Sequence, residues 1–187
     1  MGSGHEGARA ESAPDPLTGV PEAVALVRTL TDAAATVATA ESLTAGLLAS
    51  TIAGVPGASA VLRGGLVVYA TDLKHRLAGV SEHTLTVDGP VAASTAQQLA
   101  VGARTVCGAD WGVGLTGVAG PDPQDDCPVG TVFLGLSGPG GTEVVRLRLV
   151  GDRWSIRLGA VRAAVAELWR RAGQHREPSA SYPTLGQ

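Results

Sequence analysis

The sequence predicts an α/β fold, a three-layer α/β/α sandwich around a mixed, mostly parallel sheet. Two observations support this prediction. Over most of the chain, segments with helical apolar periodicity alternate with short apolar runs typical of strands. Near the C-terminal end, two strand-like runs follow one another across a glycine-rich turn, which is typical of an antiparallel hairpin. Alternation gives parallel strands joined by helices, and the hairpin makes the sheet mixed.

Composition and charge narrow the class of protein. The chain has 187 residues, of which 44% are hydrophobic, so it can bury a core in one domain. We expect that domain at 21–172, between disordered tails at 1–20 and 173–187. The formal net charge of −3 argues against nucleic acid or a membrane surface as a partner. No apolar run could span a bilayer and residues 1–16 do not resemble a signal peptide, so a cytoplasmic protein with two free cysteines is expected.

The first half of the domain is expected to contain two strands and three helices. A helix begins at Pro21, because proline is tolerated at the first helical position. Its apolar face consists of Ala23, Val24, Val27 and Leu30, with Leu26 at the edge. Strands are expected at 36–38 and within 60–70, where the chain forms either one strand or a pair of strands. The continuous apolar run at 66–69 predicts burial on both faces. Helices are expected at 47–53 and 72–77, each followed by glycine.

The second half begins with an ambiguous segment, 81–87, and a turn. Residues 91–107 give the clearest helix, with Val106 on its apolar side, and 111–115 predict a buried strand. A loop rich in glycine and proline, 116–126, leads to the two strands of the hairpin. These hairpin strands are expected at 130–137 and 143–150. The last helix is expected at 152–171. Its residues available for the core are Ile156, Ala160, Ala163, Val165 and Trp169.

The segment 39–46 places Ser42 and Thr44 where a strand passes into a helix. The first N–H groups of a helix lack intrahelical partners, and the helix dipole favours negative charge there. Such a junction can bind a phosphate or stabilise an oxyanion. The alternative is that Ser42 and Thr44 only cap the helix, since serine and threonine are common N-caps.

Lys74 is the candidate base for Ser42, because burial would lower the pKa of this lysine toward neutrality. Tyr69, at the end of a strand, could orient or relay the proton. The structural alternative is that Lys74 is an ordinary surface lysine and Tyr69 an ordinary core aromatic. Histidine, the usual base, is less favoured because His75 lies beside a lysine and an arginine on an expected surface helix.

Two further places carry polar residues at strand ends, where an α/β fold leaves a crevice. Thr116 and Gly117 offer a hydroxyl and a backbone donor on the glycine-rich loop. Arg153 and Arg157 share one face of the last helix and suit a phosphate, although a solvated helix face explains them equally well.

Two classes of cofactor site are excluded by spacing. The pattern G-x-G-x-x-G at 112–117 lies within a strand instead of joining a strand to a helix, so it is not a dinucleotide fingerprint. No spacing typical of metal ligands occurs. Neither a metal nor another cofactor is therefore expected.

Several motifs occur in a characteristic order along the chain. They are Thr39-Ala40-Glu41-Ser42-x-Thr44-x-Gly46, Gly65-x-Val67-x-Tyr69-x-x-x-x-Lys74, Gly79-Val80, Thr116-Gly117-x-Ala119-Gly120-Pro121, Pro128-Val129-Gly130-Thr131-Val132 and Gly151-Asp152-Arg153. Together they resemble the CinA C-terminal domain family, the competence/damage-inducible protein domain. The resemblance covers about 21–173, nearly the whole expected domain.

The resemblance implies a three-layer α/β/α fold with a mixed sheet and a homodimer. Standalone members include nicotinamide-nucleotide amidohydrolases, or NMN deamidases, which implies hydrolysis of nicotinamide mononucleotide to nicotinate mononucleotide and ammonia. It further implies Ser42 as nucleophile, with Tyr69 and Lys74 assisting. Substrate-binding residues would then be Glu41, Thr44, Ala45, Gly46, Thr116, Gly117, Arg153 and Arg157, with N–H groups near 44–46 holding the oxyanion and an arginine holding the 5′-phosphate.

The sequence departs from the resembled motifs at two places. Leu43 and Ala45 stand where the family motif has cysteine and glycine, and Ala45 adds a methyl group where glycine would allow close approach or an unusual φ. Residues 123–127 carry two acids where the family loop has two glycines and a lysine. These departures leave an alternative function: a catalytically weak or inactive nucleotide-binding or partner-binding module.

Overall fold

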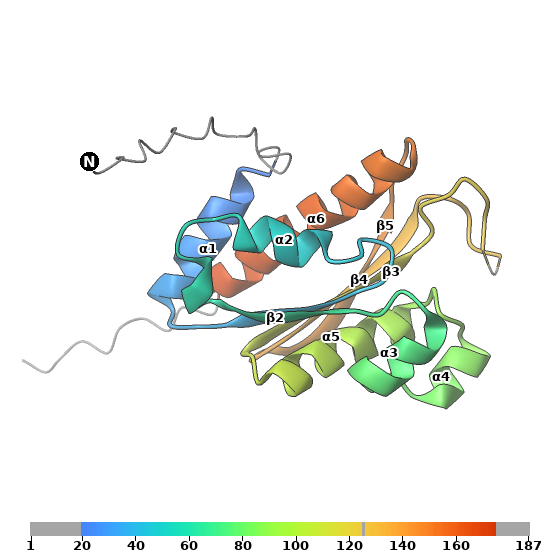
Figure 1. Cartoon of the computed structure of the whole chain (residues 1–187), viewed down its shortest axis with the longest axis horizontal. Helices are drawn as coiled ribbons and strands as arrows, with labels where there is room; N and C mark the ends of the chain where they lie inside the picture. Colours follow the sequence, from blue (N-terminus) through green and yellow to red (C-terminus); the bar gives the residue numbers. More distant parts are fainter. Residues whose placement is uncertain (1–19, 125, 175–187) are drawn as a thin grey trace, which may run out of the picture.

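The computed structural model describes residues 20–124 and 126–174, and its centre is a five-stranded sheet (Figure 1). The strands are β1 (Val37–Glu41), β2 (Leu62–Val67), β3 (Trp111–Gly117), β4 (Thr131–Gly138) and β5 (Gly141–Arg148), in the order β2-β1-β3-β4-β5. β1 pairs in parallel with β2 and β3, whereas β4 pairs antiparallel with β3 and β5. The sheet is therefore mixed, as predicted, and only β4 runs against the others.

Helices cover both faces of the sheet, which gives the three predicted layers (Figure 1). One face carries α1 (Glu22–Asp32), α2 (Leu47–Ala53) and α6 (Arg153–Gln174); the other carries α3 (Thr71–Ala78), α4 (Glu82–Val87) and α5 (Ala93–Cys107). A short 3-10 turn, Ala58–Ala60, precedes β2. The larger core cluster includes residues of α1, α2 and α6, and a smaller cluster rich in alanine includes residues of α3 and α5. No described helix combines the length and apolar character needed to cross a membrane.

Glycines in the central strands let α5 lie close against the sheet. A Cβ atom at Gly112 of β3 would overlap the carbonyl oxygen of Ala100, and Cβ atoms at Gly114 of β3 and Gly135 of β4 would both overlap that of Ala96. Two of these glycines belong to the pattern G-x-G-x-x-G, which lies inside β3 as predicted. The pattern therefore serves helix–sheet packing.

Several expectations about burial are wrong. In α1, Val24 is 60% exposed whereas Leu26 is fully buried, so the buried face is rotated from the predicted one. β2 is an edge strand whose side chains alternate between half-buried and exposed, and it is not buried on both faces. On α5 and α6, Val106 and Trp169 lie at the surface. An apolar run reports hydrophobicity, but the place of the element in the fold decides how much of it is covered.

Residues 81–87, which the sequence left ambiguous, and the end of the last helix also have a defined structure. The ambiguous segment forms α4, with Ser81 as its N-cap, since the Ser81 hydroxyl accepts a hydrogen bond from the Thr84 N–H. α6 continues to Gln174, so residues 173–174, expected in a tail, are helical. Val20, expected in the N-terminal tail, is buried in the larger core cluster. The rest of the two predicted tails, 1–19 and 175–187, lies outside the described residues. Cys107 and Cys127 are both free thiols, as predicted.

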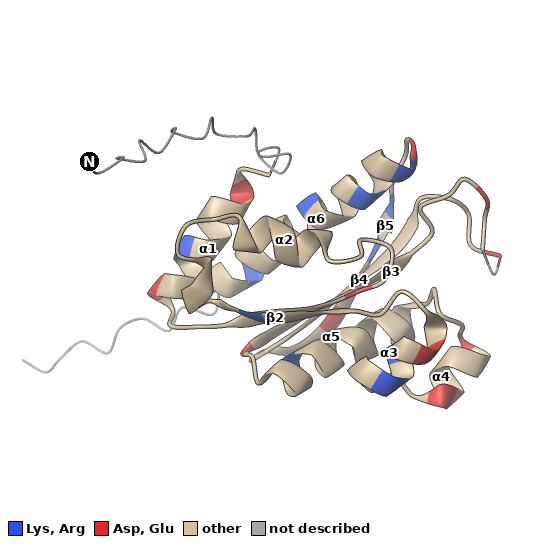
Figure 2. Ribbon diagram, in the orientation of Figure 1, with Lys and Arg blue, Asp and Glu red and all other residues tan. Residues whose placement is uncertain are grey.

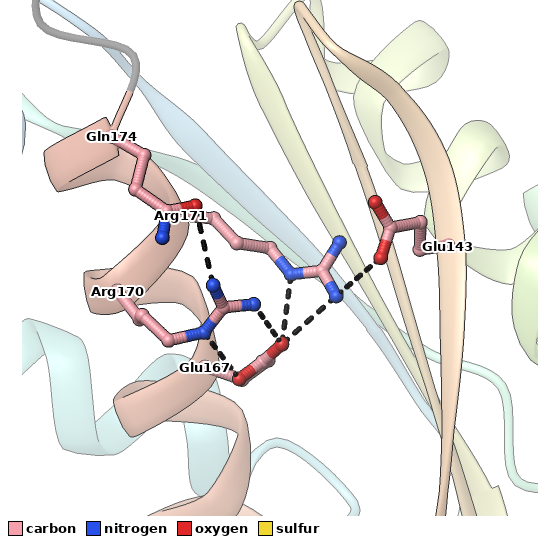
Figure 3. A network of polar contacts seen from close by, with 5 residues as sticks. All are labelled: Glu143, Glu167, Arg170, Arg171 and Gln174. Carbon is pink, nitrogen blue, oxygen red and sulfur yellow. Dashed lines mark hydrogen bonds and ion pairs between the residues drawn. The ribbon is translucent and has the colours of Figure 1, made fainter.

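A network of ion pairs connects the C-terminal end of α6 to β5 (Figure 3). Arg171 lies 2.7 Å from Glu143 of β5 and 2.8 Å from Glu167, and Arg170 lies 2.7 Å from Glu167. Gln174 accepts a further hydrogen bond from Arg170 at 3.2 Å. The hydrogen bonds from Arg170 and then Arg171 lower the pKa of Glu167 from 4.5 to about 2. Glu167 therefore remains ionised well into the acid range.

Candidate active site

A cavity of about 140 Å³ opens beyond the ends of the parallel strands. This carboxyl edge is where ligands bind in open α/β sheets. Its walls come from the segments that follow β1, β2 and β3, from the turn before α5 and from the start of α6. The sequence-predicted site residues that line it are Ser42, Tyr69, Lys74, Thr116, Gly117 and Arg153.

Ser42 and Lys74 meet inside this cavity. The Nζ atom of Lys74 lies 3.1 Å from the Oγ atom of Ser42. It also lies 3.2 Å and 3.4 Å from the carbonyl oxygens of Val68 and Tyr69. Lys74 extends from α3 and is only 2% exposed, so it is not the surface lysine of the structural alternative.

The surroundings of Lys74 favour a base. Desolvation by burial lowers the pKa of Lys74 below its ordinary value of 10.5, which increases the fraction of neutral amine. A neutral amine can donate its N–H groups to the two carbonyl oxygens and direct its lone pair at the Ser42 hydroxyl. The arrangement can therefore accept a proton from Ser42.

Tyr69 and Arg153 lie together at the exposed side of the cavity. The Nη2 atom of Arg153 donates to the Tyr69 hydroxyl at 2.6 Å, and its Nη1 atom donates to the Gly120 carbonyl at 2.6 Å. Tyr69 is 54% exposed, so it is not a core aromatic. Its carbonyl group, not its hydroxyl, contacts Lys74. The structure thus joins the Tyr69 hydroxyl to the arginine.

The carboxylate of Glu41 is directed at the N-terminus of α2 and does not line the cavity. It accepts hydrogen bonds from the N–H groups of Gly46, Leu48 and Ala49 at 2.8–3.0 Å, and from the Thr39 hydroxyl at 3.0 Å. Glu41 is 1% exposed. A buried carboxylate therefore satisfies the N–H groups of the first turn of α2, where the sequence allows a phosphate, an oxyanion or a capping side chain.

The loop between Ser42 and α2 contains an unfavourable backbone conformation. Ala45 has φ of +52° and Gly46 has φ of +89°, both in the left-handed region. That region is open to glycine, whereas it costs a residue with a Cβ atom about 1–2 kcal/mol. Of the two reasons for glycine at this position, the structure shows the unusual φ, and the loop accommodates it at Ala45 with Ser42 still in contact with Lys74. Thr44 is fully buried, and its hydroxyl has no hydrogen-bond partner among the described residues.

Arg157 contacts the backbone of the same loop and does not line the cavity. Its Nε atom donates to the Leu43 carbonyl at 2.9 Å, and its Nη2 atom donates to the Thr44 carbonyl at 3.0 Å. Its guanidinium carbon lies 5.6 Å from the centre of the Trp154 ring. The two arginines that share a face of α6 therefore have different surroundings: Arg153 reaches the cavity, and Arg157 holds the loop that carries Ser42.

The glycine-rich loop after β3 forms the opposite wall. The Thr116 hydroxyl donates to the Pro90 carbonyl at 2.6 Å, which links this wall to the turn before α5. A Cβ atom at Gly117 would meet the Thr131 carbonyl oxygen at 2.6 Å, so glycine is needed there for close packing. Figure 2 shows acidic positions on this loop, between β3 and β4. Asp125, one of the two added acids, lies outside the described residues.

Sequence reasoning missed part of the lining: Thr71, Pro90, Asp122 and Gln124 also face the cavity. The Gly-Pro-Asp sequence after β3 was a signal for Asp122, but nothing local indicated that the turn at 88–90 would reach the site. Within residues 20–124 and 126–174, His, Cys, Asp and Glu side chains do not gather in threes as a metal site would require.

Comparison with known proteins identifies relatives of the whole domain. The CinA C-terminal domain model matches residues 21–172. A CinA-like protein from Frankia casuarinae is 51% identical over 136 residues, 73% of this chain and 31% of that protein. A putative competence-damage inducible protein from a Geobacillus species is 48% identical over 133 residues, 71% of this chain and 32% of that protein. The chain therefore spans about a third of the length of these curated relatives.

Solved structures share the fold. A CinA superfamily protein from Klebsiella pneumoniae aligns with a TM-score of 0.79 at 30% identity, over 82% of this chain and 96% of that one. A competence/damage inducible protein from Agrobacterium tumefaciens aligns with a TM-score of 0.76 at 35% identity, over 84% and 96% of the two chains. Since the family model covers most of the sequence and the folds agree, this chain belongs to the CinA C-terminal domain family.

Proposed function

We propose that the chain is an amidohydrolase that cleaves the carboxamide of nicotinamide mononucleotide to nicotinate mononucleotide and ammonia. The observation that carries the proposal is the 3.1 Å contact between the Ser42 Oγ and Lys74 Nζ atoms inside the cavity. A serine is a weak nucleophile until a base lies within hydrogen-bond reach. Burial of Lys74 supports the role of base, because it lowers the pKa of the amine. The substrate is inferred from the resemblance of the site motifs.

The reaction proceeds in two balanced steps. Ser42 Oγ attacks the carboxamide carbon while Lys74 takes the hydroxyl proton; the C–N bond then breaks, and the nitrogen takes that proton to leave as ammonia. Water next attacks the ester carbon and gives a proton to Lys74. The bond between that carbon and Ser42 Oγ breaks, and the proton returns to the serine. The sum is amide plus water giving carboxylic acid plus ammonia.

The oxyanion of each step needs donors near Ser42. The N–H group of Gly46, one of the expected donors, is used by Glu41 at 3.0 Å. Within the described part of the chain, the N–H groups of Leu43 and Thr44 have no acceptor. We assign the oxyanion to these two groups, which directly follow the nucleophile in sequence.

The 5′-phosphate is assigned to Arg153. This arginine lines the exposed side of the cavity, and the Gly120 carbonyl and the Tyr69 hydroxyl fix its orientation. A guanidinium oriented in this way can present its remaining N–H groups to phosphate oxygens. The riboside, which has no phosphate, would lack this contact and should bind more weakly.

The test is product formation by the purified full chain with nicotinamide mononucleotide, measured as ammonia by a coupled assay and as nicotinate mononucleotide by chromatography. Wild type should form the two products in a one-to-one ratio. Ser50→Ala should do so at the wild-type rate, since Ser50 is exposed on α2. Ser42→Ala should lose about 10³-fold or more in rate. A wild-type rate in the Ser42→Ala protein would refute the assignment of Ser42 as the nucleophile. Heat stabilisation of wild type by the nucleotide without ammonia release would instead support the binding-module alternative.

A further inference from the structure

The loop that carries Ser42 is fixed through its carbonyl groups, and one of its fixing contacts comes from far along the chain. The Ser42 carbonyl accepts from the Ala45 N–H at 3.1 Å, and the Thr44 carbonyl accepts from the Leu47 N–H at 3.1 Å. The Leu43 carbonyl accepts from Arg157, which also donates to the Thr44 carbonyl. Among the described residues, no other donor reaches the Leu43 carbonyl.

Fixing these carbonyls also fixes the direction of the open N–H groups. In a trans peptide the C=O of one residue and the N–H of the next point in opposite directions. The Thr44 N–H therefore points away from the Leu43 carbonyl and from Arg157. In the same way, the Leu43 N–H points away from the Ser42 carbonyl, which accepts a hydrogen bond from the Ala45 N–H. A shift of the Leu43–Thr44 peptide would re-aim a donor assigned to the oxyanion.

The loop needs such a restraint because it does not rest in a relaxed conformation. Ala45 is held at φ of +52°, which disfavours a residue with a Cβ atom. Glu41 restrains the loop from the side of α2, through the Gly46 N–H. Arg157 restrains it from α6, and its own guanidinium is seated beside the Trp154 ring. The two restraints act on either side of Ala45.

We propose that Arg157 is a positioning residue for catalysis: it bridges the Leu43 and Thr44 carbonyls and so holds the Leu43–Thr44 peptide with its N–H group directed at the oxyanion site. This inference deepens the proposed function and rests on it. The Arg157 guanidinium suits the role, because a planar fork of donors can engage two neighbouring carbonyls. A lysine offers a single ammonium and cannot hold both carbonyls in one fixed geometry.

Two measurements on Arg157→Met, Arg157→Lys and the control Arg170→Met test the proposal. Arg170 lies on the same helix and contacts Glu167 and Gln174 at its other end. In the first, hydrogen–deuterium exchange is followed by mass spectrometry for the segment 42–49. Arg157→Met should exchange there about 10-fold faster or more, and Arg170→Met should match wild type. Unchanged exchange in Arg157→Met overturns the proposal whatever the substrate is.

In the second, kcat and KM are measured with nicotinamide mononucleotide. Arg157→Met should lower kcat by about 10- to 100-fold, somewhat less than loss of an oxyanion donor itself, and change KM by less than about threefold. Arg157→Lys should recover little of the loss. A raised KM with kcat intact would make Arg157 a substrate-binding residue, and a wild-type kcat despite faster exchange would make its contact merely structural; either result overturns the proposal. An inactive wild type would overturn the proposed function and the catalytic role of Arg157 together, while the exchange data would still show whether Arg157 holds the loop.

Discussion

Replacing Glu41 by glutamine should destabilise the fold strongly, although the change alters only one atom of a side chain that does not line the cavity. The carboxylate is 1% exposed and accepts four hydrogen bonds, two at each oxygen. Glutamine keeps one of these oxygens and replaces the other by an NH₂ group, which can only donate. The amide oxygen can keep Gly46 and Leu48, and the Thr39 hydroxyl can rotate to accept from the NH₂ group. The Ala49 N–H then faces another donor.

The size of the effect follows from two terms. A buried donor left without an acceptor costs about 1–3 kcal/mol. Loss of a negative charge at the N-terminus of a helix costs up to about 2 kcal/mol when the charge is buried. Together they predict a loss of about 1–5 kcal/mol, against a typical total stability of about 5–15 kcal/mol for a domain. The thermal midpoint should fall by about 2–4 °C per kcal/mol at this chain length.

Urea unfolding at pH 7, followed by circular dichroism, measures this loss. Glu22→Gln is the matched control, because Glu22 is an exposed carboxylate in the first turn of α1. The control should lose at most about 1 kcal/mol. A loss below about 1 kcal/mol for Glu41→Gln would mean that the carboxylate does not stabilise the N-terminus of α2. The structural role assigned to Glu41 would then be wrong.

Three further predictions concern backbone strain, ion pairs and the catalytic base. Ala45→Gly should raise stability by about 1 kcal/mol in the same unfolding assay, because glycine accepts the left-handed conformation; an unchanged midpoint would count against strain at this position. Since the pKa of Glu167 is lowered to about 2 in the fold, its ion pairs stabilise the protein above pH 4.5 and lose this effect as the pH falls toward 2. Glu167→Gln should therefore be about 1 kcal/mol less stable than wild type at pH 6 and nearly equal to it at pH 2; a difference that is the same at both pH values contradicts this. For Lys74, kcat/KM should rise with pH through one ionisation below 10.5, because the neutral amine is the base. Lys74→Arg should be about 10²-fold slower or worse at every pH; a pH-independent wild-type rate would remove Lys74 as the base.

The sequence predicted the layers of the fold because its periodicities are strong and local. The alternation of helices and strands and the glycine-rich hairpin turn needed no knowledge of distant contacts. Burial was predicted less well where it depends on the place of an element in the fold. The apolar run at 66–69 extends past an edge strand, so Val67 and Tyr69 remain half exposed, and the apolar face of α1 turned out to centre on Leu26.

The candidate site was predictable in the same uneven way. The motifs that resemble the family indicated Ser42 and Lys74, and the two side chains do meet. The roles of Glu41 and Arg157 were not predictable, because a carboxylate folded back onto the next helix and a guanidinium reaching across from α6 depend on tertiary geometry. The sequence offers both residues for substrate binding, Glu41 beside Ser42 and Arg157 one helical turn after Arg153, and it carries no local sign of their structural partners.

The most direct test of the central claim, that Ser42 attacks a carboxamide with Lys74 as its base, is to trap the ester. Wild type mixed with nicotinamide mononucleotide and quenched in acid within one turnover should yield a peptide in which Ser42 carries the nicotinoyl nucleotide, detected by mass spectrometry. Lys74→Met should yield far less of it. Ammonia release at the full wild-type rate with Ser42 unmodified at every quench time and replaceable by alanine would contradict the account.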